Sequence, residues 1–155
     1  MATWNLSNTK HHVLICNGSS CTEVGSEELT QAIRKEISDR QVDDTIHTTR
    51  TRCNGRCHDK CVVIAYPKGT WYKNLKPEDA SPFVDSLLAN EDYTEKLSHS
   101  FLGDGFKRAE GVVAGVTKDK EKVIKVSKIN GEKKYDFDRN KQNPGHHSDW
   151  LFRCR

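Results

Sequence analysis

The sequence contains no long apolar run and little of what would fill a large hydrophobic core. Hydrophobic residues make up 34% of its 155 residues and charged residues 30%, so we expect one domain with a modest core and an appendage. No segment approaches the roughly 18–20 apolar residues of a membrane-spanning helix. The first ten residues also lack the apolar stretch of a signal peptide. These absences predict a cytoplasmic protein with no membrane span.

A strong charge excess is also missing. The net charge is +3, and residues 1–90 contain as many acidic as basic side chains, 11 of each. The surplus therefore lies in residues 91–155, where basic and acidic residues alternate closely. Such a pattern is typical of a solvated surface and gives little reason to expect binding to nucleic acid.

The spacing of the six cysteines lacks the C-x-x-C pattern of dithiol redox enzymes. Disulfides do not persist in a reducing cytoplasm, so grouped cysteines there favour metal binding or redox chemistry. Five of the cysteines fall in two short segments, CNGSSC and CNGRCHDKC, whereas Cys154 has no neighbouring cysteine. The two grouped segments are therefore the candidate site.

Short apolar and β-branched stretches alternate with stretches that carry helix signals. The run HHVLIC is typical of a buried strand, and a cysteine and an Asn-Gly turn end it. Ser26 as a cap, with Glu27 and Glu28 behind it, suits a helix start, and Ser81 with Pro82 does so further along. The sequence predicts strands at 11–16, 45–51, 62–66 and 70–73, a turn at 67–69, and helices at about 26–39 and 81–90.

This order of elements predicts an α/β fold with a roughly four-stranded mixed sheet flanked by two helices. We divide the chain into an N-terminal arm at 1–10, a compact domain at 11–90 and a basic C-terminal extension at 91–155. In the extension, Asn130 and Gly131 are flanked by the partly alternating segments VIKVSKI and KKYDFD. This pattern predicts a β-hairpin there.

Two pairs of cysteines follow two of the predicted strands. Cys16 and Cys21 give C-x4-C, and Cys53 and Cys57 give C-x3-C. Four thiolates arriving as pairs on two loops suit a 2Fe-2S cluster, which takes two cysteines per iron. Structural zinc sites with four cysteines also use paired ligands two to four residues apart. The spacing alone leaves both metal centres open.

Several segments together resemble the thioredoxin-like 2Fe-2S ferredoxins, a family related to the small iron-sulfur subunit of NADH dehydrogenase. The segments are CNGSSC with Val24 and Gly25 after it, then RCNGRC, and then VVIAYPKGTWY. The resemblance covers about residues 11–90 and implies a thioredoxin-like fold with one 2Fe-2S cluster. Matched residue by residue, the cluster ligands of the family fall on Cys16, Cys21, Cys53 and Cys57.

The resemblance also implies a function: a one-electron carrier that is not itself an enzyme. Its partners would be redox-enzyme donor and acceptor proteins, with a homodimer as a further possibility. The sequence departs from the family pattern after Cys57, where His58, Asp59 and Lys60 lead to Cys61. Cys61 directly precedes an apolar strand, so we expect it to be buried there, with a role as alternative ligand to Cys57 left open.

Two other functions fit the residues less well. One is a zinc-stabilised binding module, and the other is a thiol redox or cluster-delivery protein that uses Cys61 or Cys154.

The cysteine loop also contains three cations, Arg52, Arg56 and Lys60. Cations near a reduced, negatively charged cluster favour its reduced form, although ordinary solvated charges explain these three equally well.

Overall fold

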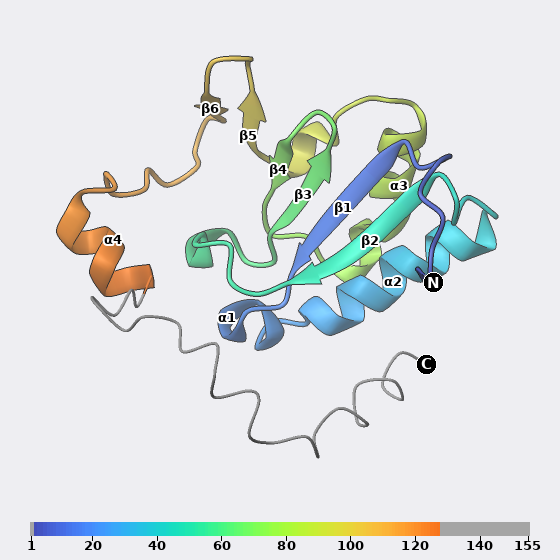
Figure 1. Cartoon of the computed structure of the whole chain (residues 1–155), viewed down its shortest axis with the longest axis horizontal. Helices are drawn as coiled ribbons and strands as arrows, with labels where there is room; N and C mark the ends of the chain where they lie inside the picture. The colour runs from blue at the N-terminus through green and yellow to red at the C-terminus, as the bar shows by residue number, and fades with distance from the viewer. Residues whose placement is uncertain (1, 128–155) are drawn as a thin grey trace. The chain divides into compact units, whose positions relative to one another are not determined.

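A computed structural model describes residues 2–127 of the chain (Figure 1). These residues divide between one unit that spans residues 1–115 and a second unit that begins at Val116. Within residues 2–127, no helix has both the length and the apolar character needed to cross a bilayer.

The first unit is built on a six-stranded mixed sheet with the strand order β2-β1-β3-β4-β5-β6. β1 and β2 run parallel, and all other neighbouring strands are antiparallel. The strands are β1 (His11–Cys16), β2 (Ile46–Thr51), β3 (Val63–Tyr66), β4 (Thr70–Tyr72), β5 (Leu97–Phe101) and β6 (Phe106–Arg108); the α-helices of this unit are α1 (Ser19–Thr22), α2 (Ser26–Asp39) and α3 (Ala80–Leu88).

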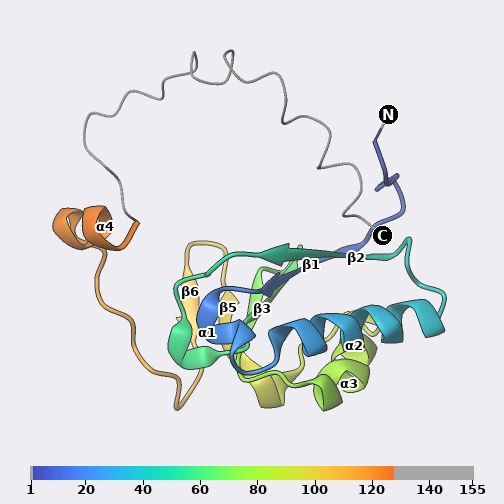
Figure 2. The same cartoon turned by 90° about the horizontal axis from the view of Figure 1, so that it is seen from below.

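Helices α2 and α3 cover the same face of the sheet, and the main core lies between them and the strands (Figure 2). Val13 and Ile15 point from β1 into this layer, where Leu29, Ile33 and Phe83 meet them from the helices, all fully buried. Burying one such side chain contributes about 1.5–3 kcal/mol. β1 is thereby fixed at the centre of the unit, and its last residue is Cys16.

The four strands and two long helices that the sequence predicts are all present, but the sheet continues beyond residue 90. β5 pairs with β4, with Trp71 opposite His99, and Ser98 is buried. The expectation of four strands and a domain ending at 90 is therefore too short, because the compact unit runs to residue 115. The added strands β5 and β6 carry mostly polar residues and join through a glycine-rich turn, so the sequence shows little apolar alternation there.

The structure differs from the prediction at the start of both long helices. Gly25, with φ of +91°, precedes α2, and Ser26 is already the first helical residue. Its hydroxyl instead donates to Asn17 Oδ1 at 3.2 Å. The second helix begins at Ala80, one residue before Ser81. Ser81 Oγ instead accepts from Arg40 Nη2 at 2.8 Å, so neither serine side chain caps its helix.

The second unit contains α4 (Lys120–Ser127), which overlaps the first arm of the hairpin expected around Asn130 and Gly131. Residues 123–127 of that arm are therefore helical and not a strand, and residues 128–129 lie outside the described residues. Asp119 favours the helix because its Oδ1 accepts from Lys122 N at 2.8 Å, as an N-cap does. The turn and second arm of the hairpin, and Cys154, lie outside the described residues.

Truncation tests where the compact unit ends. We expect a chain ending at Gly115 to keep the melting temperature of the full chain, because it retains all six strands. A chain ending at Asn90 loses β5 and β6 and should melt at least about 8 °C lower, roughly 1–2 kcal/mol for a domain of this size. Circular dichroism melting of the three chains measures this, and equal melting of the two shortened chains would contradict it.

Candidate metal centre

The first cysteine pair lies where β1 ends. Cys16 is the last residue of β1, and Cys21 lies in the short helix α1 that follows the turn. Both side chains are nearly inaccessible, with exposures of 2% and 3%. The Cys16 thiol lies 3.6 Å from Arg52 O, in the loop that carries the second pair. The buried Cys16 sulfur thus faces the adjacent strand's loop.

The second pair, Cys53 and Cys57, lies in the loop after β2 and is exposed to solvent. The two Sγ atoms are 3.8 Å apart, and Gly55 N donates to Cys53 Sγ at 3.3 Å. Two metal–thiolate bonds of about 2.3 Å at a tetrahedral angle would place sulfurs about 3.8 Å apart. The loop therefore holds this pair at the spacing that one metal ion requires.

Parallel pairing of β1 with β2 brings the two loops together. In the register Cys16 lies opposite Thr51, and the next amide, Asn17 N, donates to Thr51 O at 2.8 Å. Beyond this bond the chains touch at Gly18, where an added Cβ would lie 2.9 Å from both Cα and Cβ of Cys53. Only glycine permits so close an approach.

A hollow of about 190 Å³, including its open mouth, separates the two loops. All four predicted ligands line it, together with three other residues: Gly18, Ser20 and Arg56. Cys61 does not line it. This buried thiol lies behind the first pair, with its Sγ 3.6 Å from Cys21 O. The structure thus brings Cys57, and not Cys61, to the common hollow.

Two of the buried thiols, Cys21 and Cys61, disfavour negative charge when no metal is present. Burial raises the pKa of the Cys21 thiol to about 12, and the neighbouring sulfurs of Cys16 and Cys61 act in the same direction. Burial likewise raises the pKa of Cys61. At neutral pH these two groups are therefore thiols, and a metal that binds Cys21 must displace its proton.

The donor set fits a two-iron group. Within residues 2–127, no three Cys, His, Asp or Glu side chains gather around one point as a single metal ion requires. Two facing pairs suit two irons with two cysteines each, whereas a zinc ion needs four donors around one centre. Gly55 N already donates to Cys53 Sγ, whereas the buried side-chain nitrogen Asn54 Nδ2 has no hydrogen-bond partner among the residues that the structure describes. The cysteine loop thus also contains a free donor.

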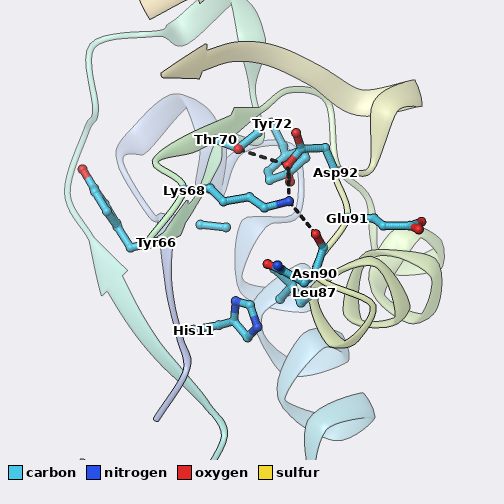
Figure 3. Close-up of a pocket in the computed structure, with 10 residues that line it drawn as sticks. His11, Tyr66, Lys68, Thr70, Tyr72, Leu87, Asn90, Glu91 and Asp92 are labelled. Atoms are coloured by element: carbon cyan, nitrogen blue, oxygen red, sulfur yellow. Dashed lines mark hydrogen bonds and ion pairs between the residues drawn. The ribbon is translucent and has the colours of Figure 1, made fainter. Parts of the chain in front are cut away.

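A second hollow, of about 220 Å³, lies at the other end of β1 and contains no cysteine (Figure 3). Several of its polar groups bond to one another: Lys68 Nζ donates to Asn90 O at 2.7 Å, and Asp92 accepts from Thr70 and Tyr72. These bonds tie the β3–β4 turn to the segment after α3. The hollow therefore has a structural explanation.

Two features of the site are absent from the sequence prediction. One is the contact of Gly18 with Cys53, for which the glycine between two cysteines was the available signal. The other is the selection among the three loop cations, because only Arg56 lines the hollow whereas Arg52 is exposed. Nothing in the sequence distinguishes the two arginines, since the distinction depends on residues far along the chain.

The known proteins that this chain resembles are described as 2Fe-2S ferredoxins. The family model of the thioredoxin-like [2Fe-2S] ferredoxins matches residues 5–88. A candidate 2Fe-2S ferredoxin of Priestia megaterium is 49% identical over 111 residues, covering 71% of this chain and 87% of that protein. A 2Fe-2S ferredoxin of Clostridium pasteurianum is 29% identical over 98 residues, covering 58% of this chain and 96% of that protein.

A solved structure is similar as well. The crystal structure of the wild-type thioredoxin-like [2Fe-2S] ferredoxin from Aquifex aeolicus has a TM-score of 0.53 and 31% sequence identity. The match covers 57% of this chain and 96% of that one. The residues matched by the family model include all four cysteines of the hollow and end before β5.

Replacing Gly18 tests the loop contact. In Gly18→Ala the new methyl collides with the Cys53 backbone, so we expect about 1–3 kcal/mol of destabilisation and a clear loss of bound iron. Gly105→Ala is the matched control, because a Cβ there meets nothing within 4 Å. Iron content and chemical denaturation measure both effects, and a Gly18→Ala protein with full iron would refute the contact's importance.

Thiol labelling tests the electrostatics of the metal-free site. After iron removal under reducing conditions, iodoacetamide should modify Cys53 and Cys57 before Cys21, which is buried. Because the pKa of Cys21 is raised to about 12, its thiolate fraction and labelling rate should rise about tenfold per pH unit between pH 7 and 10. Mass spectrometry of peptides measures these rates; a Cys21 rate independent of pH would contradict the raised pKa.

Proposed function

This chain belongs to the thioredoxin-like [2Fe-2S] ferredoxin family, and we propose that it carries a single cluster on four cysteines and transfers one electron at a time. The cofactor of the family is a 2Fe-2S cluster, and ferredoxins are electron carriers. One observation supports the finer assignment: Cys16, Cys21, Cys53 and Cys57 line one hollow.

In this proposal each loop supplies the ligands of one iron. Cys16 and Cys21 would hold one iron from β1 and α1, and Cys53 and Cys57 would hold the other from the loop after β2. When bound, the cluster supplies a site that accepts one electron, because one of its two ferric ions becomes ferrous. The chain itself positions the sulfurs, donates from Gly55 N to Cys53 Sγ and excludes water from the inner pair.

The two pairs differ in exposure, which suggests where electrons enter and leave. Cys16 and Cys21 lie behind the protein surface, whereas Cys53 and Cys57 reach it. We infer that donor and acceptor enzymes dock over the loop of Cys53 and Cys57, where the electron has the shortest distance to travel. The protein performs no catalysis of its own in this scheme, and a homodimer, which the family resemblance leaves open, stays a prediction.

We also infer a reducing location, the cytoplasm. The five cysteines within the described residues are free, and four of them have to stay reduced for a cluster to assemble. A compartment that keeps thiols reduced meets this need, whereas an oxidising one would favour disulfides. Fractionation of cells that produce the protein at natural levels checks this inference.

Spectroscopy of anaerobically purified protein tests the function directly. We expect two irons and two inorganic sulfides per chain, visible absorption that bleaches on reduction, and an EPR signal that appears with one electron per chain. Zinc in place of iron, or a redox titration that consumes two electrons per chain, would refute the proposal.

Single alanine variants test the ligand assignment. Alanine at Cys16, Cys21, Cys53 or Cys57 removes a thiolate ligand, so each variant should purify colourless or with most of its iron missing. Cys61→Ala is the matched control, because it removes a buried thiol from the same region without touching the hollow. It should keep its spectrum and lose about 1 kcal/mol of stability.

The alanine variants of Cys57 and Cys61 test most directly which of the two residues is a ligand. A colourless Cys61→Ala protein beside a Cys57→Ala protein with a normal spectrum would reverse the assignment of these two residues. Full iron in all four ligand variants would remove the four-cysteine site altogether. Absorption spectra and iron analysis of the five variants distinguish these results.

A further inference from the structure

We propose that Arg56 sets the reduction potential of this ferredoxin. We also propose that residues 97–115, which contain β5 and β6 and lie beyond the family match, hold Arg56 in place. The cysteine loop contains three cations, but only Arg56 lines the hollow. Arg52 is exposed, and Lys60 lies outside the lining. This inference rests on the four-cysteine cluster proposed above.

Arg56 is held from two sides at the wall of the hollow. Its Nε donates to Asp59 Oδ2 at 2.7 Å, and its Nη2 lies 2.7 Å from the same carboxylate oxygen. Nη2 also donates to the carbonyl of Val113 at 2.7 Å. The guanidinium is therefore confined, and its side chain is only 18% exposed. A fixed, poorly solvated cation acts more strongly on its surroundings than a solvated one.

Asp59 is the positioning residue for this cation. Its side chain is 5% exposed, so its charge requires a partner. Ser98, from β5, donates its hydroxyl to Asp59 Oδ2 at 3.2 Å, and Asn74 N donates to Asp59 O at 3.0 Å. The carboxylate thus links the cysteine loop to a strand that follows 40 residues later in the chain.

The segment after β6 completes the support. Ala109 N donates to Ser98 O at 2.8 Å, and Val112 is buried, which places the Val113 carbonyl against Arg56. A Cβ at Gly115 would lie 3.3 Å from Arg56 Nη1, so the chain passes close to the guanidinium there. Residues 97–115 therefore have a specific task at the metal centre, although none of them lines the hollow.

Coulomb attraction gives the direction of the effect. The reduced cluster has one more negative charge than the oxidised one, so a nearby cation stabilises the reduced form and raises the potential. Asp59 opposes this effect, but it lies behind Arg56 and does not line the hollow. The cation is nearer, and its contribution prevails.

Arg56→Gln tests the proposal, with Arg52→Gln as the matched control that removes the same charge from the same loop. At a fixed applied potential, we expect the ratio of reduced to oxidised protein to fall about tenfold in Arg56→Gln, which is about 59 mV for a one-electron couple. Arg52→Gln should change the ratio less than twofold. Spectroelectrochemical titration of the full chain measures both ratios, and a wild-type potential in Arg56→Gln overturns the proposal.

The salt dependence of the shift in reduction potential distinguishes a fixed, partly buried cation from a solvated one. The shift in Arg56→Gln should persist in 1 M salt, because partly buried charges are screened less than exposed ones. Any shift in Arg52→Gln should disappear there. A shift in Arg56→Gln that also disappears would contradict the fixed position of Arg56.

Arg56→Gln leaves the Asp59 carboxylate buried without its partner and can weaken cluster binding for that reason. The double variant with Asp59→Asn removes both charges and keeps the site neutral. It should retain the cluster and show a smaller shift in the same direction, because the nearer charge is still lost. Absence of any shift in this variant, or loss of its cluster, assigns the pair a purely structural role and overturns the proposal.

The wild-type protein distinguishes this failure from failure of the proposed function. Two irons and a one-electron reduction in the wild type, with an unmoved potential in both Arg56 variants, refute only the role of Arg56. A wild type without a 2Fe-2S spectrum refutes the proposed function itself. Arg56→Lys adds a readout, because it retains the charge and should keep the ratio within about threefold of wild type while losing the two-sided grip of the guanidinium.

Discussion

The contact between Gly18 and Cys53 is the constraint on which the rest of the site depends. Two cysteine pairs separated by more than thirty residues can share a hollow only if their loops touch, and the parallel strands β1 and β2 bring them to the same sheet edge. The two loops can then touch because Gly18 has no side chain to keep them apart. Core packing against α2 and α3 then fixes β1, so the position of the inner sulfurs is set by the hydrophobic layer.

The site is asymmetric, and this asymmetry organises its chemistry. Both inner sulfurs are buried, and burial raises the pKa of Cys21, whereas the outer sulfurs meet solvent, where a partner can approach. A metal group that replaces the proton of Cys21 brings negative charge into this buried region. Arg56 is the cation at its wall, and the carboxylate of Asp59 orients it. The arrangement therefore combines shielding on one side, access on the other and one fixed positive charge between the loops.

The sequence predicts the part of the fold that local patterns encode. The strands around the cysteines and both long helices follow from apolar runs and from residues at helix ends, and the two cysteine pairs indicate a metal centre by spacing alone. β5 and β6 are missed because they are short and mostly polar. β5 is stabilised by pairing with β4 and β6 by pairing with β5, and a local sequence pattern does not contain such pairing. The choice of Arg56 over Arg52 is missed for the same reason, since it depends on contacts with Ser98 and Val113 through Asp59 and the main chain. The interpretation of residues 91–155 as one extension fails at this point, because its first part belongs to the sheet.

The final strand of the sheet also bears on how the protein behaves in a crowded cell. Without β5 and β6, the edge of the sheet would be β4, whose sequence Thr-Trp-Tyr offers unpaired amides beside large aromatic rings. Such an edge is a template for strand addition by other chains. The sheet ends instead at β6, which has only three residues, two of them Lys107 and Arg108. A short edge with two positive charges is a poor template for strand addition, so the segment that reaches the metal centre also replaces the aromatic β4 edge with a short, charged one.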